Sequence, residues 1–375
     1  MRVLMISKAC VTATYRTKVA RLNRYPDLDM GLLVPTKWGA LPFESDPSDG
    51  EYALFRADVP LSGRNHFHWY PGLAGYVRQF RPDLIHIDEE PYSVVTWQAL
   101  RVAEAFRIPS LFFTWQNIEK RYPLPFSAME HYAYRRTVGA IAGNQEAEEV
   151  LRHKGYRQPI WIIPQFGTDV SMFFPRERTP IRARYGVSGS FVVGYVGRLV
   201  EDKGIGDLLA AVTPLLKADR EMGLVVVGRG PMSEAVKSWS TQEQLQRQVT
   251  VVPWVASDAM GEVMNLMDVL VLPSRTTPRW KEQFGRVLTE AMASGDVVVG
   301  SDSGEIPHVI GDAGLVFPEG DAAALREAIA RLRHNPDEYA RLRQRGLDRV
   351  RAYFTQDVIA ERTREVYLAL GGLSG

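Results

Sequence analysis

The chain has 375 residues, 45% of them hydrophobic, and a formal net charge of +1 at pH 7. This length suits two domains, and the near-neutral charge gives no reason to expect a nucleic-acid partner. The one cysteine, Cys10, cannot form a disulfide within the chain, which is typical of a reducing compartment. The chain has no apolar run of about 18 residues, and residues 1–7 read as a strand rather than a signal peptide. We therefore expect a soluble cytoplasmic protein.

In the first half of the chain, short apolar segments alternate with helical ones. Strands are expected at residues 2–7, 31–34, 84–87, 110–113 and 140–142. Such alternation predicts a parallel sheet with helices on both faces. Ligands of these sheets bind beyond the carboxyl ends of the strands, so polar residues directly after a strand are candidate ligand contacts.

Three acidic residues follow the predicted strand 84–87. At the carboxyl end of the sheet, Asp88, Glu89 and Glu90 could hold the hydroxyl groups or the cation of a substrate. They could equally stabilise the start of a helix over residues 91–106, because negative charge is favourable at a helix N-terminus. Both interpretations stay open.

Amide and aromatic side chains mark two further candidate positions. Gln116 and Asn117 follow the strand 110–113, and an amide can hydrogen-bond a hydroxyl but cannot act as an acid or base near neutral pH. Residues 65–70 are dense in aromatics and include His68, so they are expected either to line a substrate or to form a packed strand. The basic and aromatic residues 118–136 could rest on an anionic membrane, or they could form an ordinary amphipathic helix.

The alternation of strands and helices resumes in the second half. Residues 166–190 are rich in Gly, Pro and Arg, as a linker would be. Further strands are expected at residues 191–196, 224–227, 249–252, 268–273, 297–299 and 315–317. The fold class is therefore α/β, with two doubly wound parallel-sheet domains, residues 1–165 and 191–354, facing across a cleft.

Two cations follow the first strand of the second domain. Arg198 and Lys203 leave the carboxyl end of the strand 191–196 together. Two fixed cations can neutralise a diphosphate as negative charge builds on it, with a two-pronged contact from arginine and a point charge from lysine.

The stretch 281–293 places two carboxylates around the start of a predicted helix. Apolar spacing after Gly285 indicates a helix, so the backbone N–H groups of residues 285–287 are first-turn donors that attract an anion. Glu290 lies one to two turns into the helix and tilts back toward its start, and Glu282 reaches from the preceding loop. An anion between two hydroxyl-seeking carboxylates describes a nucleotide sugar; the alternative is a pair of solvated glutamates beside an ordinary helix.

The run Glu282-x-Phe284-Gly285-x4-Glu290, with the flanking residues 272–274 and 300–307, resembles the signature of retaining glycosyltransferases of family 4, which have the GT-B fold. The resemblance covers almost the whole chain. It implies a bacterial enzyme that moves a hexose from a nucleotide-diphosphate sugar to an acceptor hydroxyl, with UDP preferred to GDP, in polysaccharide or glycolipid assembly.

The resemblance also implies roles for individual residues. Arg198 and Lys203 would hold the diphosphate and Glu290 the ribose hydroxyls, while Glu282 would bind the donor sugar. The further donor contacts that it implies are Gly197, Gly230, Phe284, Gly285, Arg286 and Val287.

On the acceptor side, Gln116 stands where much of the family has a histidine, and we expect it at the reacting centre. His68, Asp88, Glu89 and Asn117 are expected to contact the acceptor. The loop that contains Trp254 is implied to meet the nucleobase.

The domain roles follow from the same resemblance. Residues 1–165, with a C-terminal helix 355–370 packing back onto them, would bind the acceptor, a glycan or glycolipid, and residues 191–354 would bind the nucleotide sugar. No metal or other cofactor is expected, because Arg198, Lys203 and the helix amides supply positive charge. Peripheral contact with the inner face of the cell membrane is left open. The alternatives are a catalytically idle nucleotide-sugar-binding subunit, which Gln116 favours, and a GT-B sugar-nucleotide epimerase.

Overall fold

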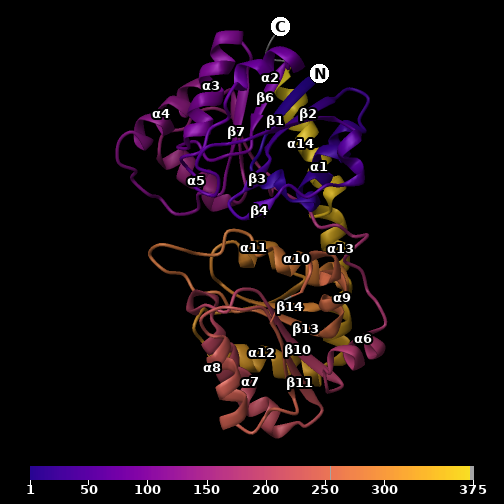
Figure 1. Ribbon diagram of the computed structural model, residues 1–375. Coiled ribbons are helices and arrows are strands. Elements are labelled where there is room, and N and C mark those ends of the chain that lie inside the picture. Colours follow the sequence, from indigo (N-terminus) through magenta and orange to yellow (C-terminus); the bar gives the residue numbers. More distant parts are fainter. Residues whose placement is uncertain (254, 372–375) are drawn as a thin grey trace. The chain divides into compact units, whose positions relative to one another are not determined.

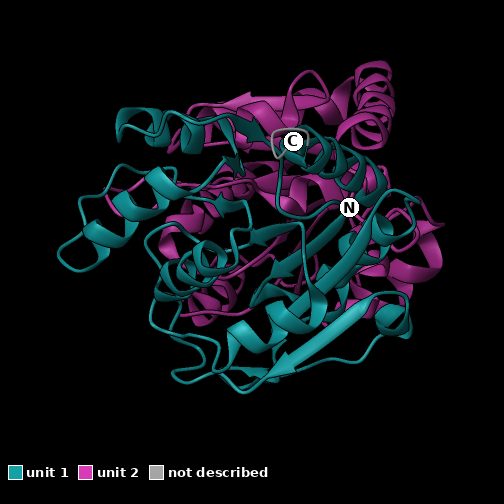
Figure 2. Cartoon of the chain, turned by 90° about the horizontal axis from the view of Figure 1, so that it is seen from above, with its two compact units in different colours: residues 1–167, 356–375 teal, residues 168–355 magenta. Residues whose placement is uncertain are grey.

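The computed structural model describes residues 1–253 and 255–371, and the chain divides into two compact units (Figure 1). Unit 1 consists of Met1–Gly167 and the segment that begins at Gln356, and unit 2 consists of Thr168–Thr355 (Figure 2). Trp254 lies outside the described residues. None of the described helices is both long and apolar enough to cross a lipid bilayer.

Unit 1 is built on a seven-stranded sheet with the strand order β5-β2-β1-β6-β7-β8-β9, in which every pair is parallel. Its strands are β1 (Arg2–Ile6), β2 (Asp29–Pro35), β5 (Ala53–Ala57), β6 (Leu84–Ile87), β7 (Ser110–Thr114), β8 (Gly139–Ala142) and β9 (Ile160–Ile162). The chain builds outward from β1 in both directions, so the strand order reverses between β1 and β6, and the ligand crevice of such a sheet opens at this reversal.

Helices cover both faces of the unit 1 sheet. They are α1 (Ala13–Asn23), α2 (Leu73–Phe80), α3 (Val94–Phe106), α4 (Phe126–Arg136), α5 (Gln145–His153) and the C-terminal α14 (Gln356–Gly371). A small antiparallel pair, β3 (Lys37–Trp38) and β4 (Leu41–Pro42), precedes β5.

The C-terminal helix α14 belongs to unit 1, where it packs on α1 and other elements that are distant in the sequence. The hydroxyl of Tyr367 lies 2.6 Å from Nδ1 of His86 on β6, and Nε of Arg364 donates to Asp27 at 2.9 Å. Burial holds the pKa of His86 well below its usual range, so the imidazole is neutral and its bond to Tyr367 is a neutral hydrogen bond in the core.

Unit 2 is built on a six-stranded parallel sheet with the strand order β12-β11-β10-β13-β14-β15. Its strands are β10 (Phe191–Val196), β11 (Met222–Val227), β12 (Val249–Val252), β13 (Val269–Leu272), β14 (Val297–Ser301) and β15 (Gly314–Phe317). The order reverses between β10 and β13, so the loops that follow these two strands diverge around one crevice.

The helices of unit 2 likewise lie on both faces of its sheet. They are α6 (Arg178–Tyr185), α7 (Ile205–Ala218), α8 (Ser233–Gln242), α9 (Met260–Val263), α10 (Arg286–Ser294), α11 (Ile306–Ile310), α12 (Ala322–His334) and α13 (Pro336–Tyr353). The two sheets confirm the predicted fold class of two doubly wound parallel-sheet domains.

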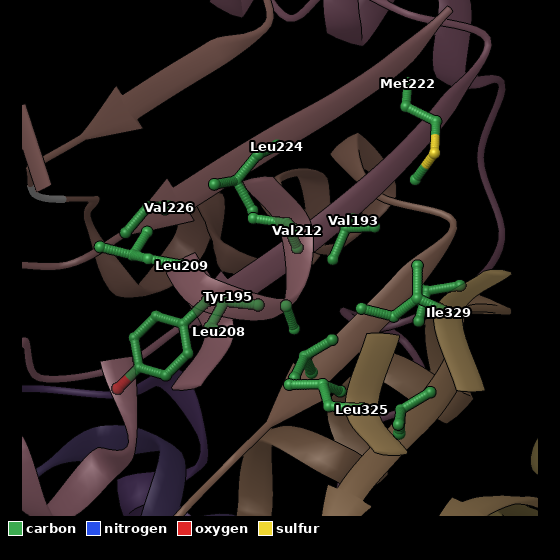
Figure 3. Close-up of a cluster of buried hydrophobic side chains, with 14 of the residues drawn as sticks. Val193, Tyr195, Leu208, Leu209, Val212, Met222, Leu224, Val226, Leu325 and Ile329 are labelled. Atoms are coloured by element: carbon green, nitrogen blue, oxygen red, sulfur yellow. The ribbon is translucent and has the colours of Figure 1, made fainter. Parts of the chain in front are cut away.

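One face of the unit 2 sheet is buried against α7 and α12. Val193 and Tyr195 of β10 point toward this face and pack with Leu224 of β11, Leu208 of α7 and Leu325 of α12 (Figure 3). Full burial of each such aliphatic side chain contributes roughly 1.5–3 kcal/mol to folding. The hydroxyl of Tyr195 points away from the aliphatic side chains (Figure 3), and it donates to the carbonyl oxygen of Arg198 at 2.8 Å. The core thereby fixes the loop that leaves β10.

The segment expected to be a linker is part of unit 2. Residues 168–190 include α6, whose Arg178 reaches Asp296 at 2.7 Å and whose Arg182 reaches Asp268 at 2.7 Å. Arg178 and Arg182, which contribute to the linker-like composition of the segment, therefore form ion pairs that hold α6 against the rest of unit 2.

Candidate functional site

The loops after β10 and β13 meet at the point where the strand order of unit 2 reverses. Gly204, at the end of the β10 loop, has a φ of +67°, and a Cβ there would lie 1.8 Å from the carbonyl oxygen of Pro273, which follows β13. Only glycine combines this backbone conformation with so close an approach. The two loops are thus held against each other directly beside Lys203.

The contact between these loops brings two predicted site residues together. Nζ of Lys203 lies 2.5 Å from Oε2 of Glu282. The same carboxylate oxygen accepts a hydrogen bond from the Ser274 hydroxyl at 2.8 Å, and the ammonium group also lies 4.4 Å from the ring centroid of Trp280. Lys203 is therefore held by an ion pair with Glu282 and by a cation–π contact with Trp280. Both partners lie about 70 to 80 positions later in the sequence.

Arg198, in the loop after β10, is exposed. Its side chain has no hydrogen-bond or ion-pair partner among the residues the structure describes. Burial raises the pKa of Tyr195, the negative charge of Glu282 raises it further, and the positive charge of Arg198 lowers it. Both charged groups therefore act on the same hydroxyl at the end of β10, which gives this edge an available guanidinium beside the Lys203–Glu282 pair.

Gly197 and Gly230 lie where the loops after β10 and β11 touch. A Cβ on Gly197 would lie 2.9 Å from the hydroxyl oxygen of Tyr195. A Cβ on Gly230 would lie 2.3 Å from the carbonyl oxygen of Leu199. Both glycines, predicted as donor contacts, therefore have a packing reason that acts without any ligand.

Helix α10 begins at the same edge without a side-chain cap. Gly285, its N-cap, has a φ of +74°, and its carbonyl oxygen accepts a hydrogen bond from the N–H of Leu288 at 2.8 Å. The amides of residues 285–287 therefore form the positive end of the helix dipole, as predicted for Arg286 and Val287. The ring of Phe284 packs on Phe354, with the ring centroids 5.7 Å apart.

Glu290 projects from the second turn of α10. Its Oε1 lies 3.0 Å from Nε of Arg286, and its side chain is 13% exposed. Burial raises the pKa of Glu290, and the neighbouring Arg286 offsets part of that rise. Both carboxylates of the motif are thus paired with a cation of unit 2: Glu282 with Lys203, and Glu290 with Arg286.

The predicted acidic residues of unit 1 lie where its own strand order reverses. Asp88 accepts a hydrogen bond from the Ser7 hydroxyl at 2.6 Å and another from the Gln165 amide at 2.9 Å. Glu89 accepts the backbone N–H of Lys8 at 3.1 Å and pairs with the ammonium group of the same residue. The loops after β1 and β6 are therefore joined by these carboxylates.

The alternative reading of the acids as helix-stabilising charges is wrong. Helix α3 begins at Val94 and has no acidic residue in its first turn. Glu90 instead accepts the Thr114 hydroxyl at 2.6 Å and the N–H of Trp115 at 2.9 Å. It thus holds the end of β7, the strand that leads to Gln116.

Asp88 is expected to titrate near pH 6. Burial raises the pKa of its carboxyl from an ordinary 3.8 to about 6, and Lys18, Ser7 and Gln165 offset part of the effect. Because the folded pKa exceeds the unfolded one, the stability gained from binding this proton is complete below pH 3.8 and is lost as the pH rises through 6. Carboxyl ¹³C NMR, with the signal assigned by Asp88→Asn, should give a midpoint near 6, and a midpoint near 4 would contradict this account.

Gln116 and Asn117 follow β7 as predicted, and both side chains are mostly buried. The backbone N–H of Gln116 donates to the Thr114 hydroxyl at 3.0 Å, and its side-chain amide donates to the carbonyl oxygen of Ile118 at 3.4 Å. Its Oε1 is buried and finds no partner within the described part of the chain. Asn117 donates to Glu146 at 3.2 Å. Of the two amides, Gln116 offers the vacant acceptor.

His68 lies in the core of unit 1, so the expectation that it contacts an acceptor is not met. Its ring is fully buried against Trp38, with the centroids 4.7 Å apart, and residues 65–70 form a turn and irregular structure instead of the alternative strand. Burial, and then the charge of Lys8, lowers the pKa of His68 to about 3. The 3.7 Å approach of its Nε2 to Glu89 is therefore not an ion pair. An aromatic loop folded into a core has the same composition as one that lines a substrate.

The sequence did not indicate Trp280, and it marked Glu90 as a candidate substrate or helix contact without indicating its bond to Thr114. Trp280 contacts Lys203 across a loop, and Glu90 fixes β7 through Thr114. A signal existed only for Glu90, which directly follows a predicted strand. Within residues 1–253 and 255–371, no three His, Cys, Asp or Glu side chains cluster as metal ligands would.

Comparisons with known proteins show which sequences and folds the chain is similar to. Residues 177–349 match the family model described as "Glycosyl transferases group 1". Alpha-maltose-1-phosphate synthase of Mycolicibacterium smegmatis is 27% identical over 385 aligned positions, which span 93% of this chain and 92% of that protein.

Solved structures show the likeness of the fold. Sucrose-phosphate synthase from Thermosynechococcus elongatus matches with a TM-score of 0.73 at 20% identity, over 100% of both chains. Anabaena HepE, in complex with UDP and glucose, matches with a TM-score of 0.72 at 19% identity, over 98% of this chain and 99% of its own. The chain therefore has the two-domain GT-B fold, and its residues 177–349, which form most of unit 2, match the group 1 glycosyl transferase model.

Proposed function

We propose that the chain is a bacterial retaining glycosyltransferase of family 4. Unit 2 binds a nucleotide-diphosphate sugar, UDP in preference to GDP, and unit 1 binds a hydroxyl-bearing glycan or glycolipid that receives the hexose. The observation that carries this proposal is the Lys203–Glu282 pair beside the uncapped start of α10, at the reversal of the unit 2 sheet. The preference for UDP draws support from HepE, which is described in complex with UDP and glucose.

The chemistry that suits these residues is stabilisation of a leaving diphosphate. As the bond between the anomeric carbon and the phosphate oxygen breaks, negative charge grows on the diphosphate, and Lys203, Arg198 and the amides at the start of α10 stabilise it. The acceptor oxygen bonds to the same face of the anomeric carbon, and its proton passes to the departing phosphate oxygen. These cations supply the positive charge that a metal ion supplies in other transferases, so the reaction proceeds without one.

Gln116 and Glu282 position the sugar and the acceptor in this scheme. The vacant Oε1 of Gln116 accepts a hydrogen bond from a hydroxyl group, and Glu282 does the same for the donor sugar. We place the enzyme in the cytoplasm, in polysaccharide or glycolipid assembly, with residues 118–136 toward the inner face of the membrane. Leu124 in that segment is 78% exposed.

Replacing Glu290 with alanine should weaken nucleoside diphosphate binding more than it slows the chemical step. The ribose hydroxyls lose their acceptor, whereas the reacting bond lies elsewhere. Titration calorimetry with UDP should show affinity reduced about tenfold, on the order of 1.4 kcal/mol for a lost hydrogen bond to a charged group. Glu234→Ala, which removes an exposed glutamate of α8, is the matched control. An unaltered affinity in Glu290→Ala would remove Glu290 from the ribose role.

Thermal-shift measurements with UDP, GDP and ADP, followed by product analysis, test the proposed function. A nucleotide that binds the folded chain raises its melting temperature, and we expect the largest shift with UDP. The matching nucleotide sugar should then transfer its hexose to an alcohol with retained anomeric configuration. An isomerised nucleotide sugar without transfer would identify an epimerase instead. Binding with neither hydrolysis nor transfer would identify a binding subunit.

A further inference from the structure

Unit 1 contains a basic pocket that includes none of the predicted donor or acceptor residues, although its lining residues between 131 and 136 belong to the segment placed toward the membrane. The ends of α4 and α5 and the segment that leads into β9 line an open pocket with a volume of about 670 Å³, and Figure 1 shows α4 and α5 on the same side of the unit 1 sheet. This volume is within the range of small-molecule sites, roughly 300–1,000 Å³.

The pocket lies at the amino ends of the sheet strands, opposite the carboxyl ends where Gln116 lies. Helix α4 ends at Arg136 and leads into the first residues of β8, and residues 154–158 lead into the first residues of β9. These are the amino ends of the strands, whereas Gln116 follows the carboxyl end of β7. In a parallel sheet the amino and carboxyl ends of the strands lie on opposite sides, so the pocket is distinct from the candidate acceptor site.

Four cations line the pocket, and no acidic residue does: Arg135, Arg136, Lys154 and Arg157. Two of them are neutralised by neighbours. Nζ of Lys154 lies 2.6 Å from Glu130, and Nε of Arg136 lies 2.8 Å from Glu104. The other two carry charge without a partner.

Arg135 and Arg157 are the two unneutralised cations. Both side chains are exposed, and neither has a hydrogen-bond or ion-pair partner in the part of the chain that the structure describes. A cation in the last turn of a helix is favourable for the helix dipole, which explains Arg135. It does not explain Arg157, which lies outside the helices. The positive charges of Arg135 and Arg157, which line one pocket, repel each other unless an anion binds between them.

We propose that this pocket binds a phosphate group, carried either by a soluble phosphate ester or by a lipid headgroup. Arginine donates two parallel N–H bonds to phosphate oxygens, and Arg135 and Arg157 can each donate to the same group. The proposal does not depend on the transferase activity, because none of these residues belongs to the donor or acceptor site.

Calorimetry with inorganic pyrophosphate tests the pocket in the full-length chain. The donor site would also bind this probe, so every protein carries Lys203→Ala. The pocket variant adds Arg135→Gln and Arg157→Gln. The control adds Arg220→Gln and Arg326→Gln, two exposed arginines of unit 2 whose side chains have no hydrogen-bond or ion-pair partner among the described residues. We expect the pocket variant to bind at least tenfold more weakly, and the control to bind as the parent does.

Vesicles separate the two sources of the phosphate. The same proteins are sedimented with vesicles of phosphatidylglycerol and with vesicles of phosphatidylcholine. If the phosphate belongs to a lipid, the pocket variant loses binding to the anionic vesicles as well as to pyrophosphate. If it is soluble, only pyrophosphate binding is lost. Equal pyrophosphate affinity in the pocket variant and the control overturns the proposal, whatever the vesicles do.

Discussion

Replacing Lys203 with alanine is expected to slow sugar transfer by a hundredfold or more. A fixed cation that stabilises charge developing in the transition state contributes on the order of 3 kcal/mol. Lys203 is positioned for that task by Glu282 at 2.5 Å and by the ring of Trp280. Because the lost charge acts on the leaving group, the turnover number should fall more than the affinity for the acceptor does. Steady-state kinetics with the donor sugar measures both.

Two controls separate this catalytic effect from a folding defect. Lys217→Ala removes an exposed lysine that pairs with Glu243 at 2.5 Å, and it should leave turnover unchanged because exposed pairs contribute little. Circular dichroism of Lys203→Ala should give a native spectrum, since Glu282 keeps its hydrogen bond from Ser274. A folded Lys203→Ala variant with parental turnover would remove this lysine from the catalytic role.

Gly204→Ala is expected to disrupt both stability and transfer. The new Cβ would lie 1.8 Å from the carbonyl oxygen of Pro273, on a residue with a φ of +67°. A backbone atom cannot move aside as a flexible side chain does, so the loop must shift and carry Lys203 away from Glu282. Strain of this kind costs roughly 2–4 kcal/mol. Transfer should fall at least tenfold, because a small misplacement of a catalytic group is costly.

Gly206→Ala is the matched control for this variant. It lies two residues further on, in the first turn of α7, and a Cβ there meets no atom within 4 Å. Alanine is a better helix former than glycine, so this change should be neutral or slightly stabilising. Hydrogen exchange of the β10 and β13 amides should report weaker protection in Gly204→Ala and parental protection in Gly206→Ala. Equal protection in the two variants would show that the loop contact does not fix this edge.

The fold could be predicted because its signals are local. Each strand is a short apolar run, and each run is followed by a helical segment, so the parallel sheets follow from the order of elements alone. The meeting of Lys203 and Glu282 was also within reach of the sequence, since each follows a strand that flanks the reversal of the sheet. The resemblance of residues 282–290 to the family signature selected Glu282 from among the other polar residues of these loops.

Other features depend on partners that are distant in the sequence. The arginines of α6 read as linker residues because their partners, Asp268 and Asp296, lie about 90 and 118 positions later in the chain. His68 read as a substrate contact because nothing in its own segment indicates that Trp38 covers it. The role of Glu90 required knowing that Thr114 ends the neighbouring strand. Burial and tertiary pairing of this kind are not encoded in local spacing.

The most direct test of the central claim is the position of the diphosphate in a crystal structure of the chain with UDP. We predict that its phosphate oxygens lie within hydrogen-bonding distance of Nζ of Lys203 and of the amides that begin α10, where the strand order of unit 2 reverses. A diphosphate bound at another edge of the sheet, with the contacts of Lys203 unchanged, would contradict the account.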